Sequence, residues 1–81
     1  MANELDRKYD FADMVPCIQE YCVDHEIAVP RWRIAVDEEL IAFQANVLRA
    51  IRSLGFAVAE EDRQELAREV ADRIRGLGVL Q

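Results

Sequence analysis

The chain has 81 residues, with sixteen acidic residues against ten basic ones and a formal net charge of −6. This length suits one small domain, and 52% apolar and 32% charged residues are typical of a folded chain and not of a disordered one. No stretch approaches the roughly 20 apolar residues that a membrane-spanning helix needs, and the acidic start of the chain is unlike a secretory signal. The two cysteines are too few for a disulfide framework. We therefore expect a cytoplasmic protein with reduced thiols.

The negative charge is concentrated at the start of the chain. Residues 1–29 hold seven acidic and two basic residues, net −5, whereas residues 30–55 are net +1 and residues 56–81 are net −2. An acidic surface repels phosphate groups, so binding to nucleic acid is expected to be poor and a basic protein partner is favoured. The alternative is that the charge only keeps a small domain in solution.

Residues 1–12 form a polar lead-in. After Met1, their only large apolar side chains are those of Leu5, Tyr9 and Phe11, so we expect part of this segment to dock on the body. We place a single helical domain at residues 13–81, because no internal repeat, low-complexity segment or second boundary interrupts it.

The first helix is predicted to run from Asp13 to about His25. Asp13 is a good N-cap, and Pro16 then falls in the first turn, where its missing N–H costs little. The apolar positions follow a spacing of three to four residues, which is the helical period. They are Met14, Ile18, Tyr21 and Cys22.

Residues 30–54 give the strongest helical signal. One apolar face follows the same spacing and consists of Val36, Leu40, Phe43, Val47, Ile51 and Leu54. A second stripe contains Ile34, Ile41 and Leu48, seven residues apart. The acids at positions 37–39 favour a helix start, so residues 30–36 are either a separate turn or the first turns of one long helix. Gly55 suits the position after the last turn.

The third helix is predicted to begin at Glu60, Glu61 and Asp62, whose charges favour the positive end of a helix. We expect Glu69 and Arg73, four residues apart, to pair, and the helix to end at Gly76. Its apolar face consists of Leu66, Val70 and Ile74, with Ala67 and Ala71 beside them. No segment alternates as a strand does, so the sequence predicts an all-α fold, a small three-helix domain with a long central helix. The most buried set should be Leu40, Phe43, Val47, Ile51, Leu66 and Val70.

The two apolar stripes of the central helix raise the question of what covers them. The first and third helices together could cover both, and a second copy of the chain is the alternative. A chain of this length buries only about 60% of its unfolded surface, and large exposed apolar patches are rare on monomers. We therefore expect a homodimer that forms through the central helix, with Ile34, Ile41 and Leu48 at the interface.

The sequence offers little for catalysis or metal binding. Cys17, Cys22 and His25 are the only cluster of soft ligands, but Cys17 and Cys22 lie about 140° apart around a helix, so one helix cannot bring all three to one ion. The single serine, Ser53, lacks the sequence context of a nucleophile, and no glycine-rich phosphate loop is present. We expect no enzymatic activity, no cofactor and no metal.

Arg31, Trp32 and Arg33 place an aromatic ring between two guanidinium groups. Such a triplet can contact a protein partner or stack a base and hold phosphates. The alternative is that Trp32 anchors the start of the central helix while both arginines face water. A helix-turn-helix is disfavoured because acids occupy the start of the third helix, where base contacts are usually made.

The sequence predicts a non-enzymatic protein–protein interaction module, a small acidic regulator, inhibitor or accessory subunit that binds a partner protein. The partner is expected to be basic, and a nucleic-acid-binding protein is one such partner. The candidate contact residues are Glu20, Asp24, Arg31, Trp32, Arg33, Glu60, Glu61 and Asp62. The alternative function is a dimeric DNA-binding transcriptional regulator that contacts DNA through Arg31 and Arg33.

Overall fold

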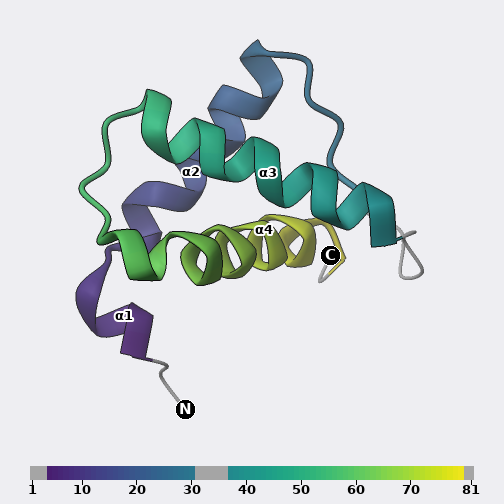
Figure 1. Cartoon of the computed structure of the whole chain (residues 1–81). Helices are drawn as coiled ribbons and strands as arrows, with labels where there is room; N and C mark the ends of the chain where they lie inside the picture. The colour runs from purple at the N-terminus through teal and green to yellow at the C-terminus, as the bar shows by residue number, and fades with distance from the viewer. Residues whose placement is uncertain (1–3, 31–36, 80–81) are drawn as a thin grey trace.

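The computed structural model describes residues 4–30 and 37–79, and these residues contain four α-helices and no strand (Figure 1). The elements are α1 (Glu4–Lys8), α2 (Phe11–Asp24), α3 (Asp37–Ser53), the single 3₁₀ turn η1 (Glu60–Asp62) and α4 (Arg63–Val79). The described part of the chain measures 30 × 29 × 22 Å. The all-α prediction with three longer helices is confirmed, and a fourth, short helix precedes them. No helix among the described residues is long and apolar enough to cross a membrane.

The three longer helices enclose one core. α3 and α4 run side by side in opposite directions, and α2 crosses behind α3 and contacts both (Figure 1). The largest fully buried side chains are Ile18, Ile51, Leu66, Ile74, Val47, Val70 and Cys22. Helical spacing explains this set, because each helix turns one apolar face inward.

The predicted core is confirmed at five of its six positions. Phe43, Val47, Ile51, Leu66 and Val70 are each at most 2% exposed. Leu40 is only half-buried, and Leu54 at the other end of the same stripe is 44% exposed. Leu40 lies in the first turn of α3, and Leu54 directly follows its last residue. Val36 lies outside the described residues. Residues 31–36 all do, so the structure does not test whether this segment joins α3.

The prediction that the first helix begins at Asp13 is wrong. α2 begins at Phe11, and the Asp10 side chain accepts a hydrogen bond from the Asp13 backbone N–H at 3.3 Å. The earlier start adds a buried residue to the apolar face, since Phe11 is 6% exposed. Pro16 consequently lies inside the helix rather than in its first turn.

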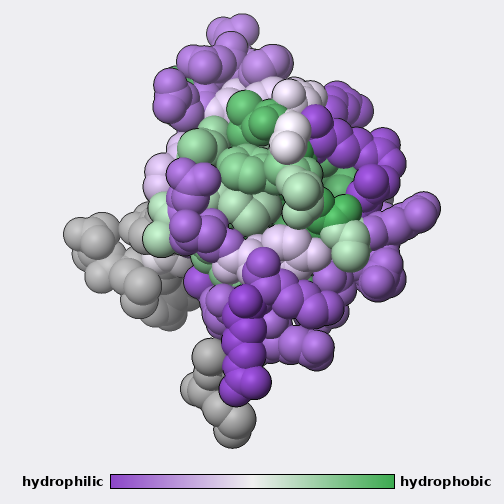
Figure 2. All heavy atoms as spheres, turned by 90° about the vertical axis from the view of Figure 1, so that its left-hand side faces the viewer, coloured by the Kyte–Doolittle hydropathy of each residue, from purple (hydrophilic) through white to green (hydrophobic). Residues whose placement is uncertain are grey.

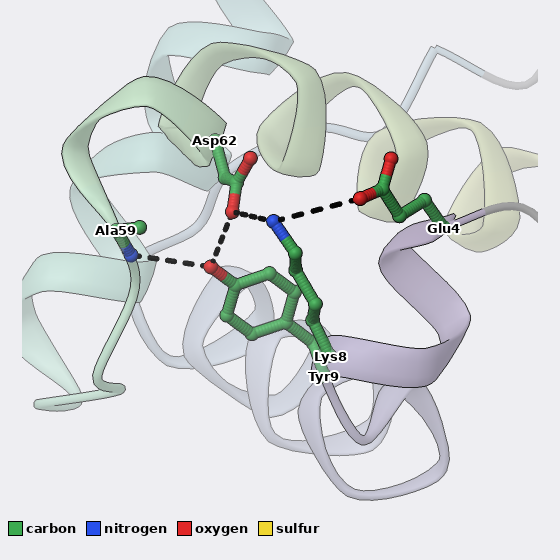
Figure 3. Close-up of polar contacts among 5 residues, drawn as sticks. All are labelled: Glu4, Lys8, Tyr9, Ala59 and Asp62. Atoms are coloured by element: carbon green, nitrogen blue, oxygen red, sulfur yellow. Dashed lines mark hydrogen bonds and ion pairs between the residues drawn. The ribbon is translucent and has the colours of Figure 1, made fainter.

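The lead-in docks on the body, as expected, through its own helix and a polar clasp. Leu5 in α1 is 3% exposed. The Tyr9 hydroxyl donates to the Asp62 carboxylate at 2.8 Å and accepts from the Ala59 N–H at 3.1 Å (Figure 3). Lys8 lies 3.3 Å from the same carboxylate. A helix of five residues is not stable alone, so these contacts hold α1 in place.

α3 ends at Ser53, and Gly55 takes the position after the last turn, as the sequence predicts. This glycine has a φ of +77°. The Gly55 N–H donates to the Arg52 carbonyl at 3.1 Å and the Phe56 N–H to the Ile51 carbonyl at 3.2 Å. These two bonds form a Schellman motif, and Phe56 packs against the core.

α2 ends in the same motif without a glycine. The Glu26 N–H donates to the Val23 carbonyl at 3.2 Å and the Ile27 N–H to the Cys22 carbonyl at 2.8 Å. Glu26 therefore takes a φ of 54°, a conformation that disfavours residues with a Cβ.

The prediction that Gly76 ends the last helix is wrong, because α4 continues through it to Val79. A glycine ends a helix only where the backbone takes a positive φ, and Gly76 has none. The predicted pair of Glu69 and Arg73 is present, with Arg73 Nε 3.3 Å from Glu69 Oε1. Arg73 also reaches Asp6 in α1 at 2.7 Å.

Candidate functional site

A groove lies between the second half of α2 and the end of α3. We call it the acidic groove, and it is lined by Cys17, Glu20, Tyr21, Asp24, His25, Ser53 and Leu54. Four of these residues lie in α2 and His25 is its C-cap, and they recur at intervals of three and four, so they share one side of that helix. The Schellman motif at Gly55 turns the chain directly after Ser53 and Leu54, which places these two residues beside α2.

The acidic side of the groove is formed by Glu20 and Asp24. They are four residues apart in α2 and exposed. Neither takes part in an ion pair with another residue in the part of the chain that the structure describes. Asp24 is the last residue of α2, at the end of the helix that carries the negative partial charge of the dipole. The last turn of α2 holds no lysine or arginine to offset this charge.

Two stacked rings form the neighbouring part of the groove wall. The Tyr21 and His25 ring centroids are 3.9 Å apart and their planes differ by 18°. His25 Nδ1 lies 2.9 Å from the Tyr21 carbonyl oxygen, which accepts the hydrogen bond. This bond closes the end of α2 and fixes the orientation of the imidazole relative to the phenol.

The apolar side of the groove leads to an exposed apolar surface. Leu54 lines the groove and begins residues 54–59, which we call the apolar connector. In this connector Ala57 and Ala59 are exposed and Phe56 and Val58 are half-buried. Figure 2 views the side of the molecule on which this connector lies in Figure 1, and apolar side chains gather there inside a hydrophilic rim. The apolar connector therefore adds exposed area to the groove.

The second acidic group lies at the far end of the apolar connector. Glu60 and Glu61 are exposed in η1, as the prediction of a contact surface requires. Asp62 is different, since it is only 9% exposed and its carboxylate is engaged by Tyr9 and Lys8 (Figure 3). The Tyr9 hydroxyl, with help from Lys8, lowers the pKa of Asp62 although burial acts in the opposite direction. Asp62 therefore serves the fold and has little carboxylate surface left for a partner.

The remaining predicted residues belong to the arginine–tryptophan triplet and to the dimer interface. Arg31, Trp32, Arg33 and the interface residue Ile34 lie outside the described residues. Ile41 is 66% exposed on α3, whereas Leu48 is half-buried and packs against the chain's own core.

The soft-ligand cluster is divided by the fold. Cys22 is 2% exposed in the core, and burial raises the pKa of its thiol. Cys17 is half-buried and lines the acidic groove together with His25. Within residues 4–30 and 37–79, no three His, Cys, Asp or Glu side chains are placed to hold a metal ion.

The sequence indicated the acids of the groove and missed the rest of it. Glu20 and Asp24 were candidates because of the charge of the first helix. The ring pair could have been found from the spacing of Tyr21 and His25, which puts both on one side of a helix. The contribution of Leu54 depends on a contact between two helices that are far apart in sequence.

Comparisons with protein-family models, with curated proteins and with solved structures found no match to this chain.

Proposed function

We propose that this protein is a non-enzymatic interaction module, a small acidic regulator, inhibitor or accessory subunit that binds a basic protein partner. The surface that binds is the acidic groove together with the apolar connector. The mechanism is mixed: apolar side chains supply buried area, and the carboxylates on either side orient a positively charged partner.

One observation carries this proposal. The apolar connector lies between two sets of exposed acids, Glu20 and Asp24 across the groove at one end and Glu60 and Glu61 at the other. An apolar patch with a charged rim is the usual anatomy of a protein interface. Exposed acids on both sides of the patch favour a partner of the opposite sign and repel nucleic acid.

The experiment is a capture with paired variants. Wild-type protein, the double reversal Glu20→Lys/Asp24→Lys and the control reversal Glu65→Lys/Asp72→Lys are used as baits in an extract of the source cell. The control changes the net charge equally at exposed positions of α4. The partner is the protein that wild type and control retain and that the groove reversal loses.

Association rates then test the electrostatic role. The groove reversal should slow association several-fold at roughly 20 mM salt and have little effect at roughly 500 mM, since salt screens exposed charges. If groove and control reversals slow association equally at low salt, the acidic groove contributes only net charge and the proposed site is refuted.

We also propose that the chain forms a homodimer through α3. The exposed side chain of Ile41 supports this, because a large apolar residue at 66% exposure on the central helix is available to a second copy. Ile41→Glu should convert the dimer to a monomer in light scattering while the chain stays folded, because Ile41 is 66% exposed on its own chain. Leu48→Glu should instead unfold the chain, since Leu48 packs on its own core. A wild-type mass of one chain across a wide concentration range would refute the dimer.

A further inference from the structure

We infer that the acidic groove selects arginine over lysine in the basic partner. This inference rests on the proposed function and deepens it, because it names the side chain that the groove reads. It is carried by the placement of a stacked ring pair directly beside two carboxylates, at the negative end of a helix.

The carboxylates provide the charge. Glu20 and Asp24 are one helical turn apart, both exposed, and both line the groove. A guanidinium group presents its N–H donors in a flat fork that matches a carboxylate with two parallel hydrogen bonds, whereas an ammonium group acts as a point charge. Carboxylates alone therefore attract both cations, and their geometry adds a preference for arginine.

The rings provide the flat surface. Tyr21 follows Glu20 in α2, and His25, the C-cap residue, follows Asp24; the two rings are stacked nearly parallel, with Tyr21 half-buried against the core and His25 exposed. A guanidinium plane can lie on an aromatic face while its edge donates to a neighbouring carboxylate. Lysine gains less from such a surface because its charge is compact and strongly hydrated.

The helix end adds to the same field. α2 ends at Asp24 without a lysine or arginine in its last turn. The dipole of α2 thus makes this side of the groove more negative. The groove accordingly accepts a positive group, and Cys17 and Leu54 beside the rings accept the apolar part of an arginine-bearing segment.

The test uses two short capped peptides that combine leucines with basic residues and differ only in having arginine or lysine at every basic position. Binding is followed by the amide chemical shifts of the whole chain. We expect the arginine peptide to bind roughly two- to fivefold more tightly, the factor that a cation–π contact at an exposed site supplies. The largest shifts should fall on residues 17–25 and on Ser53 and Leu54.

Two variants of Tyr21 isolate the ring. Tyr21→Phe keeps the aromatic face and should keep the preference for arginine. Tyr21→Leu keeps an apolar side chain without the face and should reduce the preference for arginine to the part that the carboxylates and the His25 ring supply. Thermal unfolding of both variants shows that each is folded before it is titrated.

The outcomes separate this inference from the proposed function. If both peptides bind in the groove equally, or if Tyr21→Leu keeps the preference undiminished, selection of arginine by the rings is wrong and basic-partner binding stands. If neither peptide shifts the groove residues, or if Glu20→Gln/Asp24→Asn leaves both affinities unchanged, both proposals are wrong.

Discussion

Glu26 and Gly55 occupy the same position of the same helix-ending motif, and exchanging their residue types should change stability in opposite directions. Both residues follow the last turn of a helix with a positive φ, 54° for Glu26 and 77° for Gly55. A side chain costs about 1–2 kcal/mol in this region because Cβ approaches a backbone oxygen. Glycine avoids that cost, although it loses more conformational entropy on folding.

The expected magnitudes follow from this difference. Glu26→Gly should raise the free energy of unfolding by about 0.5–1 kcal/mol, the strain relieved less the added entropy of glycine. Gly55→Ala should lower it by about 1 kcal/mol through strain alone, because nothing lies within 4 Å of the Cβ it would add. Gly76→Ala tests a glycine in helical conformation, since Gly76 lies inside α4 and nothing lies within 4 Å of the Cβ that alanine would add there. It should stabilise by up to about 1 kcal/mol.

Thermal and urea unfolding measure these changes. A change of 1 kcal/mol shifts the melting temperature by roughly 4–8 °C in a domain of this size. Glu26→Gln is the matched control, because it removes the same charge and keeps the strained side chain. If Glu26→Gly stabilises no more than Glu26→Gln, the gain comes from charge and the argument from backbone strain is refuted.

Further predictions concern the core, the clasp and the thiols. Phe43→Ala should cost about 3–5 kcal/mol in urea unfolding, and a loss below about 1 kcal/mol would show that Phe43 is not core. Tyr9→Phe should lower the melting temperature at neutral pH. Because the folded pKa of Asp62 lies below its unfolded value, the clasp stabilises the fold above the unfolded pKa and loses this contribution as the pH falls through the folded one. The difference between Tyr9→Phe and wild type should therefore shrink in melts recorded below about pH 4, and a constant difference would contradict this role. A thiol reagent should label Cys17 before Cys22, because Cys22 is buried and the pKa of its thiol is raised. Mass analysis of partly labelled protein identifies the labelled residue, and earlier labelling of Cys22 would contradict the placement of α2.

Helical periodicity predicted the elements and most of the core because each helix buries a face that is encoded locally. It placed the first N-cap at Asp13, although Asp10 is an equally good capping residue and is the one that caps α2. The choice depends on Phe11, whose burial between α2 and its neighbours is a tertiary contact. Local chemistry and tertiary packing agree at Asp10 only.

Tertiary contacts also affect where a helix ends, as two glycines show. Gly55 and Gly76 are each followed by a large apolar residue, yet only Gly55 ends its helix. At Gly55 a tertiary contact accompanies the helix end, since Phe56 turns back onto the core. A short local pattern does not contain this information.

The site was predictable to the extent that it lies on one helix. Glu20, Asp24 and the ring positions of α2 follow from helical spacing. Ser53 and Leu54 line the groove only because α3 ends beside α2. Asp62 is not part of the exposed acidic surface, because the N-terminal lead-in covers it and the Tyr9 hydroxyl binds its carboxylate. Both events depend on contacts between segments that are distant in sequence.

Asp24 offers a way to tell a functional charge from a solubilising one. An acid at the end of a helix opposes the dipole and costs about 0.3–1 kcal/mol at low salt, and the last turn of α2 supplies no lysine or arginine to offset it. Asp24→Asn should therefore make the fold more stable by about that amount while it weakens binding of a basic peptide in the groove. Asp72→Asn, at an exposed position inside α4, removes the same charge and should be neutral or slightly destabilising. If both variants change stability and binding alike, Asp24 is one of several interchangeable surface charges. If stability and binding move in opposite directions at Asp24 alone, the charge is kept at a cost to the fold because the groove uses it.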